Sequence, residues 1–231
     1  MILAAHQPNY LPWAGFFYKM ARCDQFVLLD GVQYSRTSYT ARCQIKGPAG
    51  RPRWLSVPVF KKGRYHQDIS SVEVDNQADW QRTHRRSLES CYRKAPHFQE
   101  ILSLIEPALD RNWGHLAEMN TCLIKAIAQS LMIRPTFCRL SDAGLETGSS
   151  QMLVDLCLKY SANVYLSGPG GRRYLDEALF ARSGIELRFV NYHSRPYPQL
   201  WGDFVPGLSV VDMLFNCGLP AARRMVGADG D

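Results

Sequence analysis

The sequence predicts an α/β fold in which one domain is built around a parallel sheet. Short continuous apolar runs at residues 2–5 and 26–29 are typical of buried strands, and residues 13–22 between them have helical spacing. A strand, a helix and a second strand in this order form a βαβ unit, which builds parallel sheets. The same alternation returns over residues 136–190. We therefore expect a single doubly wound domain over residues 1–231.

Each element has its own local signal. Residues 37–75 carry short extended segments among glycines and prolines, which predicts a small β-rich insertion with three extended segments at 37–45, 54–59 and 69–74. Residues 78–132 have amphipathic spacing, which predicts a helical block. The remaining elements are expected as strands at 136–140, 163–167 and 186–190, and as helices at 149–160, 172–181 and 208–216, the last ended by Gly218.

The composition agrees with a packed domain. The 231 residues are 46% hydrophobic and 21% charged, which is ordinary for a globular protein. No window is apolar enough to cross a membrane, and residues 1–5 lack the basic leader and the long apolar stretch of a signal peptide. Seven scattered cysteines without a CxxC pair indicate reduced thiols. We expect a cytoplasmic protein without a membrane span.

The polar turn at residues 6–16 is the first candidate site, because ligands of open α/β sheets lie where a strand leads into a helix. His6, Gln7, Asn9 and Tyr10 offer hydrogen-bonding side chains there, and Gly15 would let a ligand approach the helix start. A helix N-terminus at this point would favour phosphate or carboxylate. The alternative is a rigid turn whose aromatic residues pack in the core.

A glycine-rich turn after a late strand is the second candidate site. Its backbone amides could hold an anion, with two arginines as charge partners. The residues involved are Ser167, Gly168, Gly170, Gly171, Arg172 and Arg173. The alternative is an ordinary turn with the arginines in solvent.

Two further sets of polar residues are weaker candidates. Asp30 follows a strand, where a carboxylate could act as a base or bind an amine, or could cap a helix or turn. Its neighbours in sequence are Gln33, Tyr34, Arg36, Arg42 and Lys46. The last set comprises Tyr197, Gln199, Ser209 and Asp212, with Ser209 also suited to cap the last helix.

The net charge, the spacing of the histidines and the cysteines indicate which partners and reactive groups to expect. The net charge of +6 suits anionic partners such as nucleotides, nucleotide sugars or RNA, although the basic run at 82–86 is also typical of a solvated helix face. The histidines show no HxxxH or HExxH spacing, so no metal site is expected. Cys43 and Cys217 are candidate thiols without an assignable partner histidine.

Several sequence blocks resemble a known family. HQPNYLPWAGFFYKM at 6–20, DGVQYSR at 30–36, WLSVPV at 54–59, YLSGPGGRRYL at 165–175 and FVPGLSVVDMLFNCG at 204–218 look like the WbqC-like family. The resemblance runs nearly end to end. It implies a place in bacterial surface-glycan gene clusters, where a glycine-transferase role has been suggested.

A more distant similarity links the chain to pantothenate synthetases and the nucleotidylyltransferase superfamily, and implies a Rossmann-like sheet of that type with helices on both faces. In that superfamily the first turn carries H-x-G-H, which binds ATP phosphates. Residues 13–16 of this chain read Trp-Ala-Gly-Phe, so Gly15 alone is kept. Gln33 would match a substrate-binding glutamine, and Arg172 and Arg173 a later basic loop.

Together these observations predict an amide-forming aminoacyl or acyl transferase, or an ATP-dependent amide ligase, acting on an amino sugar or another small amine. His6 or Asp30 would take the proton from the amine. Gln7, Asn9, Tyr10, Gln33, Tyr34, Arg36 and Lys46 would bind substrate, and the glycine turn an anion. ATP or an aminoacyl-tRNA is the expected donor, which would make tRNA a partner.

Two alternatives remain open. One is a glycosyltransferase that uses a nucleotide sugar. The other is a non-enzymatic RNA- or nucleotide-binding protein, with Tyr10, Trp13, Tyr34, Tyr39 and Trp54 as stacking candidates.

Overall fold

The computed structural model describes residues 1–145 and 149–228. The strands are β1 (Ile2–His6), β2 (Gln25–Leu28), β3 (Arg42–Lys46), β4 (Pro52–Ser56), β5 (Thr136–Arg139), β6 (Val164–Ser167) and β7 (Glu186–Phe189). The helices are α1 (Ala14–Met20), α2 (Trp80–Tyr92), α3 (Phe98–Leu109), α4 (Leu116–Ser130), α5 (Leu140–Ala143), α6 (Ser150–Lys159), α7 (Glu177–Arg182) and α8 (Val210–Met225). Three 3-10 segments complete the list: η1 (Ile69–Ser71), η2 (Asn76–Ala78) and η3 (Pro169–Arg173).

Five parallel strands form the central sheet, in the order β5-β2-β1-β6-β7. The chain runs outward from β1 through β2 to β5, and then returns to place β6 and β7 on the other side of β1. The strand order therefore reverses between β1 and β6. In open α/β sheets such a reversal is the usual place for a ligand, beyond the carboxyl ends of the two strands.

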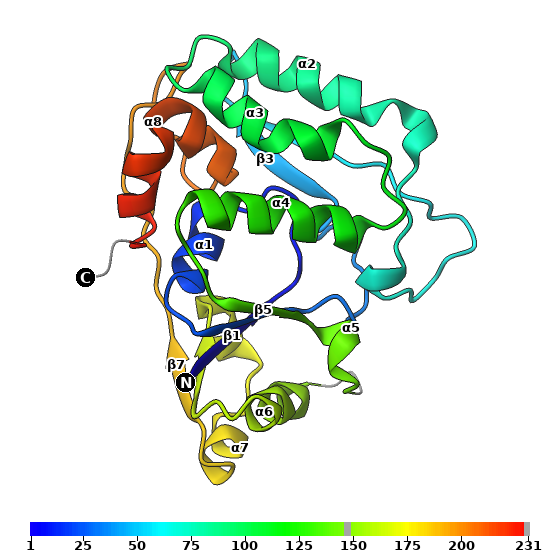
Figure 1. Ribbon diagram of the computed structural model, residues 1–231, viewed down its shortest axis with the longest axis vertical. Coiled ribbons are helices and arrows are strands. Elements are labelled where there is room, and N and C mark those ends of the chain that lie inside the picture. Colours follow the sequence, from blue (N-terminus) through cyan, green and yellow to red (C-terminus); the bar gives the residue numbers. More distant parts are fainter. Residues whose placement is uncertain (146–148, 229–231) are drawn as a thin grey trace.

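Helices cover both faces of the sheet, as the sequence predicts (Figure 1). Successive residues of a strand point to opposite faces. Ala4 and Phe26 therefore lie in a core with α1, α4 and α8, whereas Leu3 and Val27 lie in a second core with α6 and α7. The α/β fold with a parallel sheet is thus confirmed.

The insertion between β2 and β5 combines a hairpin with the helical block. β3 and β4 pair as an antiparallel two-stranded sheet. The third expected extended segment, at 69–74, was wrong as a strand: it begins as η1, and Val74 forms only a single bridge with Val59. The helical block is α2, α3 and α4, within the expected bounds.

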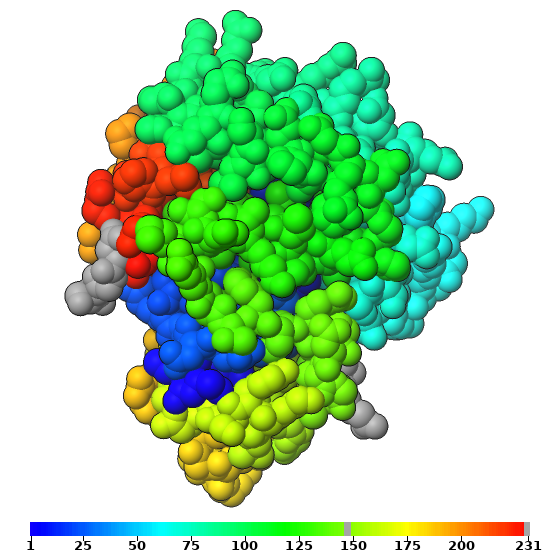
Figure 2. All heavy atoms as spheres, in the orientation of Figure 1, coloured from blue at the N-terminus to red at the C-terminus, as the bar shows by residue number. Residues whose placement is uncertain are grey.

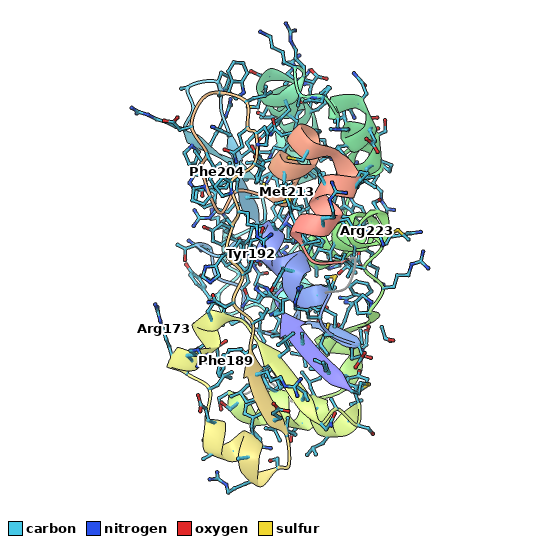
Figure 3. The ribbon with its side chains drawn as sticks, turned by 90° about the vertical axis from the view of Figure 1, so that its left-hand side faces the viewer. Arg173, Phe189, Tyr192, Phe204, Met213 and Arg223 are labelled. Atoms are coloured by element: carbon cyan, nitrogen blue, oxygen red, sulfur yellow. The ribbon has the colours of Figure 1, made fainter. Side chains whose placement is uncertain are left out.

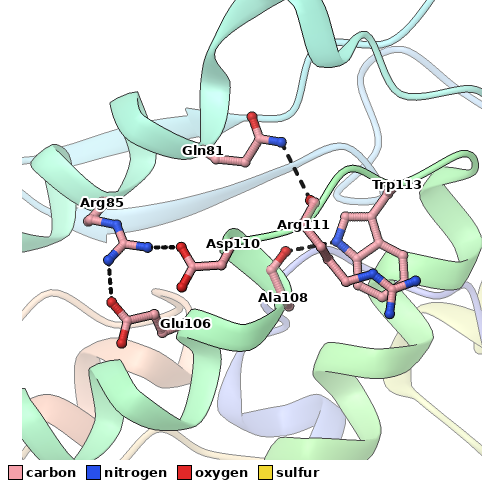
Figure 4. Close-up of polar contacts among 7 residues, drawn as sticks. All are labelled: Gln81, Arg85, Glu106, Ala108, Asp110, Arg111 and Trp113. Carbon is pink, nitrogen blue, oxygen red and sulfur yellow. Dashed lines mark hydrogen bonds and ion pairs between the residues drawn. The ribbon is translucent and has the colours of Figure 1, made fainter.

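Polar contacts fix the helical block (Figure 4). Arg85 of α2 binds both Glu106 and Asp110 at the end of α3. At the same end of the block the indole of Trp113 donates to the carbonyl oxygen of Ala108 at 2.8 Å. The ion pairs of Arg85 hold α2 against α3 at the side of the molecule away from the sheet.

Two other expectations change in detail. The helix expected at 172–181 is split into η3 and α7, because Asp176 caps α7 by accepting from the amide of Leu179 at 3.0 Å. Gly218 interrupts α8 as expected, with φ of 73°, but helical residues continue beyond it to Met225. No helix in the described ranges is long and apolar enough to span a membrane.

Candidate functional site

A cavity of about 530 Å³ opens at the point where the strand order reverses. We call it the switch-point cavity. It lies between the turn after β1, the start of α1 and the glycine turn after β6. Its lining comprises Ala5, His6, Gln7, Trp13, Gly15, Phe16, Lys19, Leu29, Ser149, Met152, Leu153, Tyr165, Ser167, Gly168, Pro169, Gly170, Gly171, Tyr174, Val190 and Tyr192. The two leading sequence-predicted sites therefore meet in one cavity.

A buried lysine contributes the positive charge of this cavity. Lys19 on α1 is 4% exposed, and its ammonium donates to the carbonyl oxygen of Ala5 at 2.8 Å. Among the described residues no carboxylate forms an ion pair with it. Burial lowers the pKa of Lys19 to about 8 because a charged ammonium is disfavoured away from water. An anionic ligand in the cavity would supply the missing counter-charge.

His6, the last residue of β1, is a neutral imidazole in the same cavity. Burial and the charge of Lys19 together lower its pKa to about 3. Its Nδ1 lies 3.0 Å from the carbonyl oxygen of Gln7. Since a carbonyl can only accept, Nδ1 carries the proton and Nε2 keeps a lone pair. His6 can therefore accept a hydrogen bond at Nε2, and it would accept a proton more readily once a bound anion offsets the charge of Lys19.

The position of Trp13, just before α1, explains why residue 15 is a glycine. The indole of Trp13 packs over Gly15, where a Cβ atom would collide with it. On its other side Trp13 contacts the ring of Tyr192, 5.4 Å away between centroids. Figure 3 shows Tyr192 beside α1. Gly15 thus lies in the expected cavity, but the group that approaches it closely in this structure is Trp13.

The glycine turn lines the opposite wall. Gly171 has no room for a side chain, because a Cβ atom would collide with Oγ of Ser167, whereas Gly168 and Gly170 face open space. The amide of Gly171 already donates to the carbonyl oxygen of Gly168, at 3.1 Å. Gly168 and Gly170 are therefore the positions at which a ligand could approach the backbone closely.

The two arginines of this turn lie outside the cavity lining. The guanidinium of Arg172 stacks on Phe189 at 4.0 Å, and the side chain of Arg173 points away from the molecule (Figure 3). They fit the alternative that the sequence left open, in which the arginines of an ordinary turn face solvent. The charge expected from them is located at Lys19 instead.

A second cavity of about 250 Å³ adjoins the first and shares His6 and Trp13 with it. Asn9 and Tyr10, two predicted substrate-binding residues, also line it. The rest of its lining is Leu11, Pro12, Tyr39, Cys43, Gln44, Gly207 and Ser209. Among the residues that the structure describes, no lysine, arginine or carboxylate is in that lining. The second cavity is therefore neutral, in contrast to the switch-point cavity.

Asp30 lies outside both cavities. It is 1% exposed, and its carboxylate accepts from Nε of Arg139 at 2.6 Å and from the amide and Oγ of Ser141 at 2.9 and 2.8 Å. This is the capping arrangement that the sequence left open for Asp30. Its oxygens are occupied, so the geometry does not support the expected role as a base.

Asp30→Asn is accordingly expected to weaken the fold and to leave ligand binding intact. Loss of the ion pair with Arg139 should lower the free energy of unfolding by about 3 kcal/mol, because the guanidinium would face an amide. Urea denaturation measures the loss, and binding of ATP at 10 °C serves as the control. Unchanged stability with lost binding would instead return Asp30 to the active site.

The other residues predicted after β2 also lie apart from the cavities. Gln33, Tyr34 and Arg36 surround a separate surface hollow, where Gln33 Nε2 lies 3.0 Å from Nδ1 of His66. Lys46 is fully buried, and its ammonium binds the carbonyl oxygens of Gly202 and Asp203. Lys46 thus holds the 202–203 loop in place. Its surroundings do not support the expected contact with substrate.

The last set of polar residues forms a buried network. The carboxylate of Asp212 accepts from the hydroxyls of Tyr92 and Tyr197 at 2.7 and 2.8 Å, and from Gln199 at 2.9 Å. Burial raises the pKa of Asp212. Ser209 caps α8 and donates to the carbonyl oxygen of Leu11 at 2.7 Å. Burial also raises the pKa of both Cys43 and Cys217, which disfavours a reactive thiolate at either.

Sequence reasoning missed Lys19, the residue that supplies the charge. The signal was a single lysine among apolar residues in the first helix, one turn beyond Gly15. It also missed Met152 and Tyr192, which come from segments far apart in the sequence.

One family model and one curated relative match nearly the whole chain. The model of the WbqC-like protein family matches residues 7–224. A protein of Mycobacterium tuberculosis described as "Uncharacterized protein Rv1507c" is 38% identical over 221 residues, which is 95% of each chain. No solved structure matches the chain. The family model covers nearly the whole fold and the cavity linings apart from Ala5 and His6, and the chain belongs to the WbqC-like protein family.

Proposed function

We propose that this protein is a two-substrate transferase that forms an amide bond between an activated acyl group and an amine. The observation that carries the proposal is the position of His6, which lines both cavities. A proton acceptor shared by two adjoining cavities suits a reaction between two bound molecules, because it can serve the point where they meet.

The difference in charge between the cavities supports a proposed assignment of the two substrates. The buried ammonium of Lys19 suits an acyl donor that carries a phosphate or another anion. The neutral second cavity, with the amides of Asn9 and Gln44 and the ring of Tyr39, suits a polar uncharged acceptor such as an amino sugar in its free-amine form. Glycine or a similar small acid is the acyl group that the family resemblance favours.

In the proposed reaction the amine nitrogen attacks the acyl carbon and forms the C–N bond. His6 Nε2 accepts the proton that the nitrogen loses. Lys19 stabilises the negative charge that develops on the acyl oxygen, and the bond to the leaving group then breaks. The leaving group would be a phosphate for an ATP-activated donor, or a ribose hydroxyl for an aminoacyl-tRNA.

Hydroxylamine trapping tests the proposal, since this small amine intercepts activated acyl groups as hydroxamates. The purified protein is incubated with radiolabelled glycine, ATP and hydroxylamine, or with glycyl-tRNA and hydroxylamine. Formation of glycine hydroxamate with either donor, above the rate without protein, is the expected result. Which donor reacts separates an ATP-dependent ligase from a direct transferase.

Thermal stabilisation completes this test, because a donor can bind without reacting with hydroxylamine. A ligand at 100 times its dissociation constant adds about 2.7 kcal/mol to stability. If no hydroxamate forms, and if neither ATP nor glycyl-tRNA stabilises the protein, the proposal is wrong. Stabilisation by a nucleotide sugar alone, with transfer of the sugar, would favour a glycosyltransferase.

A further inference from the structure

The positive charge of the chain is concentrated in one segment. Residues 31–67 contain eight lysines and arginines and no aspartate or glutamate. The whole chain has 27 basic and 21 acidic residues, so the rest carries 19 basic against 21 acidic and is slightly negative. Of the eight cations only Lys46 is fully buried. Residues 31–67 are therefore a basic surface on an otherwise nearly balanced protein.

Flat aromatic groups lie on this basic surface. Trp54 of β4 is 41% exposed and Tyr39 is 48% exposed, and their ring centroids are 5.6 Å apart. The guanidinium of Arg42 on β3 lies 4.3 Å from the centre of the Trp54 ring. Arg42 thus covers the Trp54 ring, and the Tyr39 ring lies beside it at a tilt of 44°; we call this contiguous, partly exposed group the hairpin stack.

A second group of cations surrounds the hollow of about 250 Å³ beside the insertion. Arg36, Lys61 and Arg64 all line it, together with Tyr65, which is 76% exposed. Glu73 pairs with Arg64 at 2.7 Å, and no acidic residue is in the lining. In Figure 2 the cyan part of the chain, which includes residues 61–66, protrudes from the side of the molecule. The hollow is thus open to a partner.

The hairpin stack also touches the candidate site, because Tyr39 lines the second cavity. A molecule that stacks on Trp54 and Tyr39 would have one end at the mouth of that cavity. This places the basic surface on the approach to His6.

From these observations we infer that residues 31–67 bind a single-stranded nucleic acid. Cations would neutralise its phosphates, and the exposed rings of the hairpin stack would stack on its bases. Base pairs of a duplex hide the faces of their bases, so stacking favours a single strand. An anionic membrane surface would also attract the cations, but it would not explain an arginine packed over an indole with a phenol ring beside it.

Fluorescence anisotropy with a labelled twelve-nucleotide single-stranded RNA of mixed sequence tests this inference, without any acyl donor present. Trp54→Ala is expected to weaken binding by about 5- to 140-fold, the range that follows from the loss of one stacked base. Because Trp54 is substantially exposed, the fold should survive, which circular dichroism checks. Leu158→Ala, which removes another exposed apolar side chain but lies outside the insertion and both cavities, is the control and should bind as the wild type does.

The salt dependence gives an independent readout. For single strands the logarithm of the binding constant falls with the logarithm of salt concentration by about 0.7 for each neutralised phosphate. The triple variant Arg36→Ser, Lys61→Ser and Arg64→Ser should therefore flatten the slope by about 2. The double variant Arg172→Ser and Arg173→Ser serves as the control outside the insertion.

Three outcomes would overturn the inference: equal binding by Trp54→Ala and wild type, tighter binding of a duplex of the same length, or binding to vesicles with 30% anionic lipid but not to RNA. The assay contains no donor and follows no reaction. It can therefore fail while hydroxamate still forms, or succeed while the proposed transfer fails.

Discussion

Lys19→Met is expected to remove anion binding from the switch-point cavity. Methionine has a similar length and no charge, so it can fill the same buried space beside Phe26, over which the Lys19 ammonium lies at 5.8 Å. A hydrogen bond to a charged group contributes roughly 1.5–3 kcal/mol, so binding of pyrophosphate should weaken by about 10- to 150-fold. Isothermal titration calorimetry measures this loss.

The pH dependence identifies the group responsible. A bound anion favours the ammonium form and raises the pKa of Lys19 above its value of about 8 in the free protein. Pyrophosphate affinity in the wild type should therefore be retained below pH 8, apart from the titration of pyrophosphate itself, and should fall about tenfold per pH unit above it. The Lys19→Met variant should lack this fall.

A matched substitution controls for the loss of one positive charge. Lys125 lies 5.6 Å from the centre of the Phe137 ring, a geometry similar to that of Lys19 and Phe26, but it is exposed on α4. Lys125→Met should bind pyrophosphate as the wild type does. Equal affinity in the Lys19→Met variant would show that the anion binds elsewhere.

His6→Asn is expected to abolish turnover with little change in substrate binding. The amide nitrogen of asparagine can occupy the place of Nδ1 and keep the hydrogen bond to the carbonyl oxygen of Gln7, whereas the Nε2 lone pair is lost. General base catalysis contributes about 10²- to 10⁴-fold to a rate, so the rate of amide formation should fall by that factor. Steady-state kinetics with the donor identified by hydroxamate trapping separates kcat from KM.

The pH profile of kcat/KM provides the accompanying test. Because His6 of the free protein has a pKa of about 3, it remains an unprotonated acceptor well below pH 6.5. The acid limb near pH 6.5 that an ordinary histidine gives should be absent from the wild-type profile. His115→Asn, the same substitution on the protein surface, is the control. Full activity of the His6→Asn variant would remove His6 from the mechanism.

The fold was largely predictable because its signals are local. The apolar runs of β1 and β2 and the spacing of α3 and α4 each lie within one short stretch of sequence. The 69–74 segment was mispredicted because Ile69 and the alternating Val72 and Val74 pack inward from a 3-10 turn and two isolated bridges. Alternation alone does not distinguish that packing from a paired strand.

The candidate site was only partly predictable, since membership of a cavity depends on three-dimensional neighbours. The turn after β1 and the glycine turn after β6 could be recognised because both follow strands. Their charged partner could not, because the sequence did not reveal that Lys19 faces the cavity while Arg172 stacks on Phe189. Asp30 has the same position relative to its strand as a catalytic carboxylate, and only its contacts with Arg139 and Ser141 identify its role.

The strand order also has a consequence for how the chain folds. β2 and β5 are neighbours in the sheet, yet the hairpin and three long helices separate them in sequence. β1, α1 and β2 can associate through local contacts, but β5 can join them only after a loop of more than a hundred residues has closed. The walls of the switch-point cavity come from segments that precede and follow this long connection between β2 and β5. We therefore expect refolding in several kinetic phases, with the capacity to bind pyrophosphate recovered in the slowest.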